Sequence, residues 1–220
     1  FSRDRSIILW DLETGQEIRR FGADRILGPE ALSATFTPGG RYILSNNGAL
    51  PGVNPEETAE LILWDISTGA VARTFRGHTT GIGGIAISPD GTKALSGGYM
   101  GDMILWDMET AEVLQRFSEN STDWRKIPSD IAFGQNERLA FVQGMDGIVA
   151  VWDLEQFALV AHLGQGYSNG NWAWDQIAVS PDGRWVAAYH GERGRGLWDT
   201  ATGKIISVLP DAGRGAAFSP

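Results

Sequence analysis

The sequence predicts an all-β chain made of repeated four-stranded antiparallel units. Three observations lead to this fold class. A Trp-Asp pair closes a short apolar run five times, a turn rich in Pro and Gly recurs between these runs, and a second turn follows each pair. The runs are only about five residues long and rich in β-branched and aromatic residues, which is typical of strands. Gly and Pro bound them on a short period, which argues against helices.

The Trp-Asp pairs mark the third strand, strand c, of each unit. Their tryptophans are Trp10, Trp64, Trp106, Trp152 and Trp198. The separations of 54, 42, 46 and 46 residues are close to a repeat period of about 40–45 residues. Strand c is apolar on both faces, as Ile8, Leu9, Trp10 and Leu12 show. We therefore expect both of its faces to be buried between neighbouring units.

The turns place the other strands. Strand a leads into a turn that reads ATFTPGG at 34–40, AISPDG at 86–91, IAFGQNE at 131–137, AVSPDG at 178–183 and AAFSP at 216–220. Strand b follows this turn, and strand d follows a second turn after each Trp-Asp. Proline presets φ and glycine accepts a positive φ, so such segments favour tight turns. The expected boundaries are strands c and d at 6–22, complete units at about 31–76, 82–118, 128–163 and 173–209, and a lone strand a at 213–220.

Five Trp-Asp pairs in register with five turns resemble the WD-repeat (WD40) β-propeller family, and the resemblance covers essentially the whole chain. It implies toroidal propellers, usually of seven blades, that act mainly as platforms for assembling other proteins. On this basis we expect a segment of a longer, seven-bladed propeller. Its open ends would be capped by the remaining blades or by another copy of the chain, because exposed strand edges invite aggregation.

The chain also departs from the family pattern. The family's Gly-His before strand a is present only as Gly77-His78. The aspartate six residues before the Trp is present as Asp4 and Asp146 and absent from the other three units. The buried His–Ser–Asp–Trp network that the resemblance implies is therefore expected to be incomplete in every unit. We expect a divergent member whose blades are held mostly by apolar packing.

Connection lengths predict which face binds. The interval from each Trp to the end of strand d is 11 residues in all five units, whereas the interval from strand d to the next strand a varies from 9 to 16. The interval from strand a to the Trp is 19 in three units but 28 from Phe36 to Trp64. In an antiparallel meander the d–a and b–c connections share one end, so this variable end is the expected binding face. Neutral drift of solvated loops is the alternative.

Aromatic and basic residues in these connections are the candidate partner-binding residues, since such residues anchor interfaces. They are Trp124, Arg125, Tyr167, Asn171, Trp172, Trp174, His190, Arg193 and Arg195. Packing over a blade edge or at the channel entry is the alternative for each aromatic residue, and the favoured one for Trp174. The insertion at 46–61 is a partner-binding loop or a solvated excursion. Its glutamates lack the ligand spacing of a Ca²⁺ loop, so no metal site is expected.

Composition narrows the function further. A net charge of -9 argues against general binding to nucleic acid or an anionic membrane. No apolar stretch approaches a membrane span, and the chain has no cysteine, which fits a cytoplasmic location.

The function expected from the resemblance is a non-catalytic scaffold for protein–protein interaction, with no cofactor. The alternative is a propeller that binds a small molecule or glycan at an aromatic site near the channel mouth. An enzyme is the weakest interpretation. The three histidines, His78, His162 and His190, lie in different units, and no phosphate loop, nucleophile elbow or zinc-binding helix motif is present.

Overall fold

The computed structural model describes residues 6–22, 33–49, 58–118, 127–134, 137–164, 177–180, 182–190, 194–209 and 216–218. Every regular element among them is a β-strand, which confirms the all-β prediction. None of them belongs to a helix long and apolar enough to cross a membrane.

The strands form one hairpin and four antiparallel sheets, each joined in chain order. The hairpin consists of β1 (Ile7–Trp10) and β2 (Glu17–Phe21). Blade 1 consists of β3 (Ala34–Phe36), β4 (Tyr42–Asn46), β5 (Ala59–Asp65) and β6 (Val71–His78). Blade 2 consists of β7 (Ile82–Ile87), β8 (Lys93–Gly98), β9 (Asp102–Asp107) and β10 (Val113–Ser118). Blade 3 consists of β11 (Pro128–Phe133), β12 (Leu139–Gly144), β13 (Val149–Asp153) and β14 (Ala158–Leu163). Blade 4 consists of β15 (Ala178–Val179), β16 (Trp185–Tyr189), β17 (Arg195–Asp199) and β18 (Ile205–Leu209).

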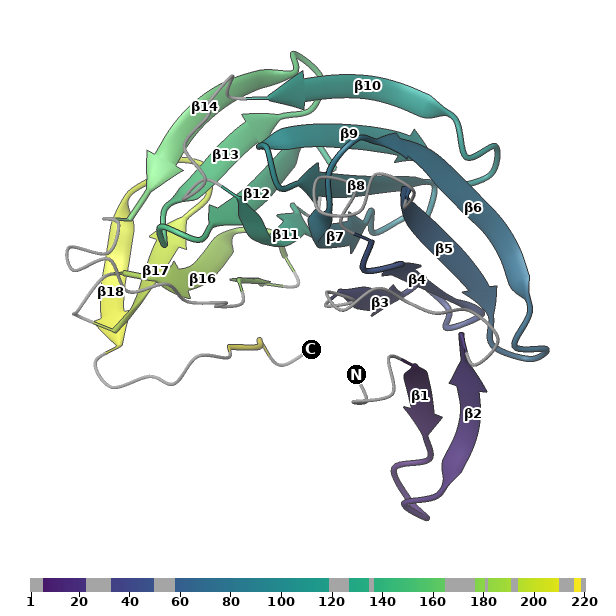
Figure 1. The fold of residues 1–220 in the computed structure, drawn as a ribbon. Helices are drawn as coiled ribbons and strands as arrows, with labels where there is room; N and C mark the ends of the chain where they lie inside the picture. The colour runs from purple at the N-terminus through teal and green to yellow at the C-terminus, as the bar shows by residue number, and fades with distance from the viewer. Residues whose placement is uncertain are drawn as a thin grey trace.

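The blades follow one another along an arc (Figure 1). Strands β3, β7 and β11 lie toward its inner side, and β6, β10, β14 and β18 run along its outer side. The hairpin lies at one end of the arc, beside blade 1. The four-stranded order and the inner-to-outer arrangement are those of propeller blades.

Apolar side chains gather between successive units rather than inside any one of them. Each of the four core clusters joins neighbouring units: the hairpin with blade 1, and then blades 1 with 2, 2 with 3, and 3 with 4. A single sheet cannot bury its own faces, so each blade depends on its neighbours. Strand c is accordingly buried along β5, β9 and β13, as the consecutive apolar positions predict.

One contact repeats at each junction. An apolar residue in the last part of the outer strand of one unit packs against the strand c tryptophan of the next unit. The ring centroids of Phe21 and Trp64 are 6.1 Å apart, and those of Phe75 and Trp106 are 5.8 Å apart. Phe117 and Trp152 are 5.1 Å apart. At the last junction Leu163 takes the place of the phenylalanine and joins the cluster around Trp198.

The two ends of the arc lack this contact. Trp10 in the hairpin is 51% exposed, whereas the other four strand c tryptophans are at most 4% exposed. Leu209, the last residue of β18, is also 51% exposed. The expectation that every strand c is buried on both faces is therefore wrong for β1. No described unit precedes it to cover Trp10.

The expectation that every His–Ser–Asp–Trp network is incomplete is also wrong, because the network around Trp106 of blade 2 has all four members, with His78 supplied by β6 of blade 1. His78 Nδ1 lies 2.8 Å from Asp102 Oδ2, and His78 Nε2 lies 2.7 Å from Ser96 Oγ. The indole of Trp106 donates to the same Ser96 Oγ at 2.7 Å. Asp102 lies four residues before Trp106 rather than six, because a tight turn closed by Gly101 N and Gly98 O leads directly into β9.

Most of the expected lone strand a at 213–220 lies outside the described residues, and its assignment remains a prediction. Its described part, residues 216–218, has no strand pairing. No further described strand lies beside it to supply backbone partners, so an extended conformation there gains no ladder hydrogen bonds.

Candidate binding face

The two ends of the blades differ in how regular their connections are. At one end, the turn end, the a–b connections at 37–41, 88–92, 134–138 and 180–184 are equal in length. At the other end, the loop end, the b–c connection covers 47–58 in blade 1 but only 99–101 in blade 2. Between strands a, b and c, the connections thus differ in length at the loop end only.

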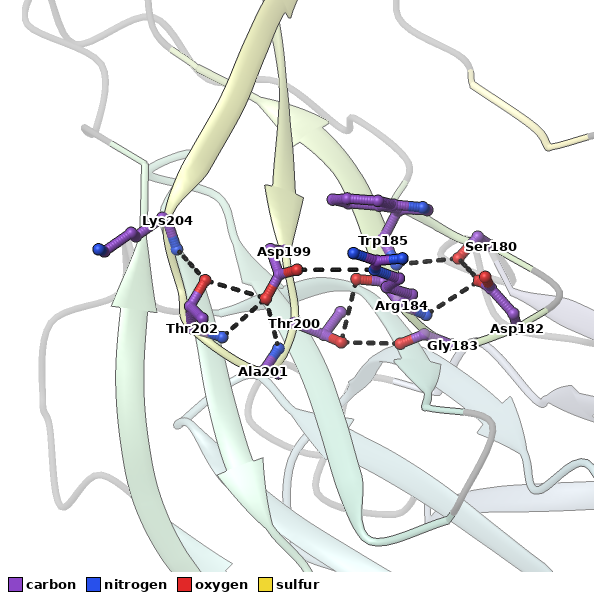
Figure 2. Close-up of polar contacts among 10 residues, drawn as sticks. All are labelled: Ser180, Asp182, Gly183, Arg184, Trp185, Asp199, Thr200, Ala201, Thr202 and Lys204. Atoms are coloured by element: carbon purple, nitrogen blue, oxygen red, sulfur yellow. Dashed lines mark hydrogen bonds and ion pairs between the residues drawn. The ribbon is translucent and has the colours of Figure 1, made fainter.

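The turn end is built by repeated side-chain caps, drawn for blade 4 in Figure 2. Asp199 of the Trp-Asp pair accepts hydrogen bonds from the backbone of Ala201 at 3.1 Å and of Thr202 at 2.9 Å. The Thr202 hydroxyl donates to the same oxygen at 2.9 Å. These bonds from Thr202 and Ala201 lower the pKa of Asp199 because they stabilise its carboxylate form. Equivalent aspartates cap the c–d turns of the other units.

Most of the candidate partner-binding residues fall outside the described part of the chain. They are Trp124, Arg125, Tyr167, Asn171, Trp172, Trp174 and Arg193. Their assignment to the binding face remains a prediction.

His190 lies where the sequence places it, in the b–c connection of blade 4, and is half-buried. Its backbone N–H donates to Gly194 O at 2.9 Å. Its ring packs edge-on against Trp198, with centroids 5.5 Å apart. His190 therefore covers the strand c tryptophan of its own blade at the loop end.

The structure corrects the placement of Arg195. It is the first residue of β17 rather than a loop residue, and it is only 2% exposed. Its guanidinium thus offers almost no surface to a partner, and we remove it from the candidate face. Its positive charge acts instead on Asp130 of the neighbouring blade.

Asp130 joins blades 3 and 4 on the inner side of the arc. Its carboxylate accepts hydrogen bonds from the backbone of Ile177 at 2.8 Å and of Ile131 at 3.0 Å. Burial raises the pKa of Asp130 to about 6, and the backbone hydrogen bonds and Arg195 oppose this rise only in part.

Two cation–aromatic pairs at the turn end were not anticipated from the sequence. The Arg184 guanidinium lies 4.7 Å from the centre of the Trp185 ring, and the Arg41 guanidinium lies 4.9 Å from that of Tyr42 (Figure 2 shows the former pair). In both pairs the arginine is the last residue of the a–b turn and the aromatic residue is the first of strand b. An Arg-aromatic dipeptide at this point of the sequence was the signal that could have predicted these pairs. Arg41 and Tyr42 also line a cleft of about 570 Å³ between blades 1 and 2.

The described residues hold no group of three or more His, Cys, Asp or Glu side chains placed to bind a metal ion. The described histidines also lie in separate blades. His78 belongs to the network around Trp106, His162 lies in β14, and His190 packs on Trp198.

Comparison with known proteins adds sequence relationships to this geometry. Residues 69–107 match the family described as "WD domain, G-beta repeat". Over 90% of its length the chain is similar to proteins named guanine nucleotide-binding protein subunit beta. It is 29% identical to the one from Oryza sativa subsp. japonica, 28% to that from Zea mays and 29% to that from Solanum tuberosum. The chain spans about half the length of these relatives, 51%, 51% and 50% respectively.

Proposed function

Given that this chain belongs to the WD40-repeat family, we propose that it is a non-catalytic scaffold that binds protein partners through the loop end of its blades. The observation that carries this proposal is the contrast between the ends. The a–b turns of constant length and the repeated caps of the c–d turns form one end, while connections that differ widely in length form the other. Loops of varied length on a fixed framework are where binding specificity is placed.

Relatives support a protein partner rather than a substrate. Their printed name, subunit beta of a guanine nucleotide-binding protein, describes a component of a multi-subunit protein. Aromatic and basic side chains in the connections of successive blades supply the residue types that anchor such interfaces. The cytoplasmic location expected from the sequence belongs to the same proposal and is checked by cell fractionation.

A pair of tryptophan variants tests the proposed face. Trp172→Ala removes an aromatic residue from a d–a connection, whereas Trp185→Ala removes one from the turn end. Proteins captured by the immobilised chain are compared between the variants, and one that is lost with Trp172→Ala but kept with Trp185→Ala is then titrated in purified form. We expect its Kd to rise by about tenfold or more for Trp172→Ala, as for interface anchors.

The reverse pattern, with loss on Trp185→Ala alone, would assign binding to the turn end. Equal affinity of both variants and the unaltered chain would remove both tryptophans from the interface. Circular dichroism of both variants shows whether the fold is intact.

We further propose that the exposed ends of the arc are covered by additional propeller blades. Trp10 lacks the preceding phenylalanine or leucine that covers every other strand c tryptophan, and Leu209 lacks the following tryptophan. Each exposed side chain is therefore one half of the contact that is complete at the four junctions between them.

Light scattering with ANS fluorescence tests this coverage. The 220-residue chain alone should self-associate or bind ANS strongly, because both apolar ends are uncovered. A monodisperse monomer with little ANS binding would show that the chain covers its own ends.

A further inference from the structure

A cavity of about 210 Å³ lies between blades 2 and 3. Its buried walls come from Met103 of β9, Val142 of β12, and Ala150 and Trp152 of β13, all at most 7% exposed. Asp146 and His162 line it where the protein is more open to solvent. Strands β9 and β13 face each other across this junction (Figure 1).

Two residues that line the cavity stand at the positions of Ser96 and Asp102 in the His78 network. Val142 pairs with the residue two positions before Trp152, as Ser96 pairs with the residue two positions before Trp106. Ile148 stands four residues before Trp152, as Asp102 stands four before Trp106. Val142 and Ile148, which line the cavity, thus stand in place of Ser96 and Asp102.

Trp152 differs from Trp64 and Trp106 in its hydrogen bonding. The indole N–H of Trp64 donates to Ser45 at 3.0 Å, and that of Trp106 donates to Ser96 at 2.7 Å. With Val142 in the serine position, the Trp152 indole has no such acceptor, and it makes no hydrogen bond within the described chain although Trp152 is only 4% exposed. An indole is a donor only, so this N–H can donate to an acceptor placed in the cavity that Trp152 lines.

We propose that this cavity binds a small, uncharged aromatic molecule that carries one oxygen acceptor, of the phenol class. The apolar walls and the Trp152 face suit a flat ring, and an apolar cavity of about 150 Å³ is already large enough for benzene. The oxygen accepts the hydrogen bond that Trp152 Nε1 lacks. The apolar walls disfavour a charged ligand, because burying a charge there is costly. The site does not depend on the proposed protein-binding face.

Fluorine NMR with 4-fluorophenol and 4-fluorotoluene tests the site. We expect 4-fluorophenol to bind, because its oxygen can accept the hydrogen bond of the Trp152 indole. A cavity without a donor would instead reject the hydroxyl group and accept only 4-fluorotoluene. Ala150→Leu should weaken both compounds by roughly tenfold or more, because the larger side chain fills the space.

Val142→Ser tests the hydrogen bond itself. It restores in blade 3 the serine of blade 2, so Trp152 gains an internal acceptor and the phenol loses its advantage. The Kd of 4-fluorophenol should rise about fivefold relative to that of 4-fluorotoluene, the effect of one net hydrogen bond. Ala188→Ser, at the equivalent position of blade 4, is the control and should leave both Kd values unchanged.

Failure of 4-fluorophenol to bind, or binding that Ala150→Leu leaves unchanged, would overturn the site. A Kd ratio that Val142→Ser leaves unchanged would overturn the role of the Trp152 indole. A thermal melt of each variant establishes that it is folded, and the ratio of the two compounds on the unaltered chain tests the proposal without any variant.

Discussion

The hairpin and blade 2 contain the same four residues, Ile-Leu-Trp-Asp, at 8–11 and 104–107, in different surroundings. Trp10 is 51% exposed and Trp106 is fully buried. Yet the turns that follow are alike: Asp11 accepts the N–H of Thr14 at 2.7 Å, and Asp107 accepts that of Thr110 at 2.8 Å. The motif therefore specifies a strand and its capped turn locally, while burial of the tryptophan depends on the preceding unit.

That preceding unit supplies most of what surrounds Trp106. Phe75 packs against its ring, and His78 reaches Ser96, which accepts the indole hydrogen bond. Desolvation opposes ionisation of Asp102, but the hydrogen bond and charge of His78 hold its pKa below the ordinary value. The hairpin offers Trp10 neither an aromatic partner nor a serine acceptor among the described residues.

The largest expected effect separates these two tryptophans. Trp106→Ala should lower the free energy of unfolding by about 3–5 kcal/mol, because it empties a closed site between blades. Trp10→Ala, the matched control, should cost about 0.5 kcal/mol or less because its ring is half exposed. Urea melts of the two variants measure the difference. A loss below about 1 kcal/mol for Trp106→Ala would contradict the packing described for blade 2.

A smaller effect should distinguish a serine inside a network from one with a single partner. Ser96→Ala removes an acceptor from Trp106 and the contact with His78, so we expect a loss of about 2 kcal/mol. Ser45→Ala removes only the Trp64 hydrogen bond and should cost about 1 kcal/mol. The same melts measure both. Equal losses would show that His78 contributes nothing to blade 2 through Ser96.

The smallest effect extends the comparison to the junction of blades 3 and 4 and depends on pH. The pKa of Asp130 is raised to about 6 in the fold, so the folded chain binds a proton more tightly than the unfolded chain does. Stability should therefore rise as pH falls through about 6, by about 1 kcal/mol between pH 7 and pH 5.

Asp130→Asn should remove this rise, because the amide does not titrate. The aspartates whose pKa values are lowered in the fold, such as Asp199 and Asp107, stay ionised over this range and do not obscure it. Identical pH profiles for the variant and the unaltered chain would assign the titration elsewhere.

Sequence spacing predicted the regular part of the molecule because that part is local. Turn residues and consecutive apolar positions determine the strands of each blade, and Asp199 caps its turn through residues two and three positions away. Spacing failed for Asp102, whose role depends on a short b–c turn and on a histidine from the preceding outer strand. It also failed for Arg195, since a residue count cannot distinguish the last loop position from the first position of a buried strand.

The sequence by itself determined that this chain forms four-stranded WD40 blades, and it located their strands and capped turns, because neighbouring residues decide backbone conformation there. Only the tertiary structure decided which tryptophans are covered, which network is complete and where a cavity remains. Those properties arise between blades, where each side chain meets residues from a neighbouring repeat. A different residue at an equivalent position, such as Ser96 in blade 2 and Val142 in blade 3, changes the contact without changing the strand.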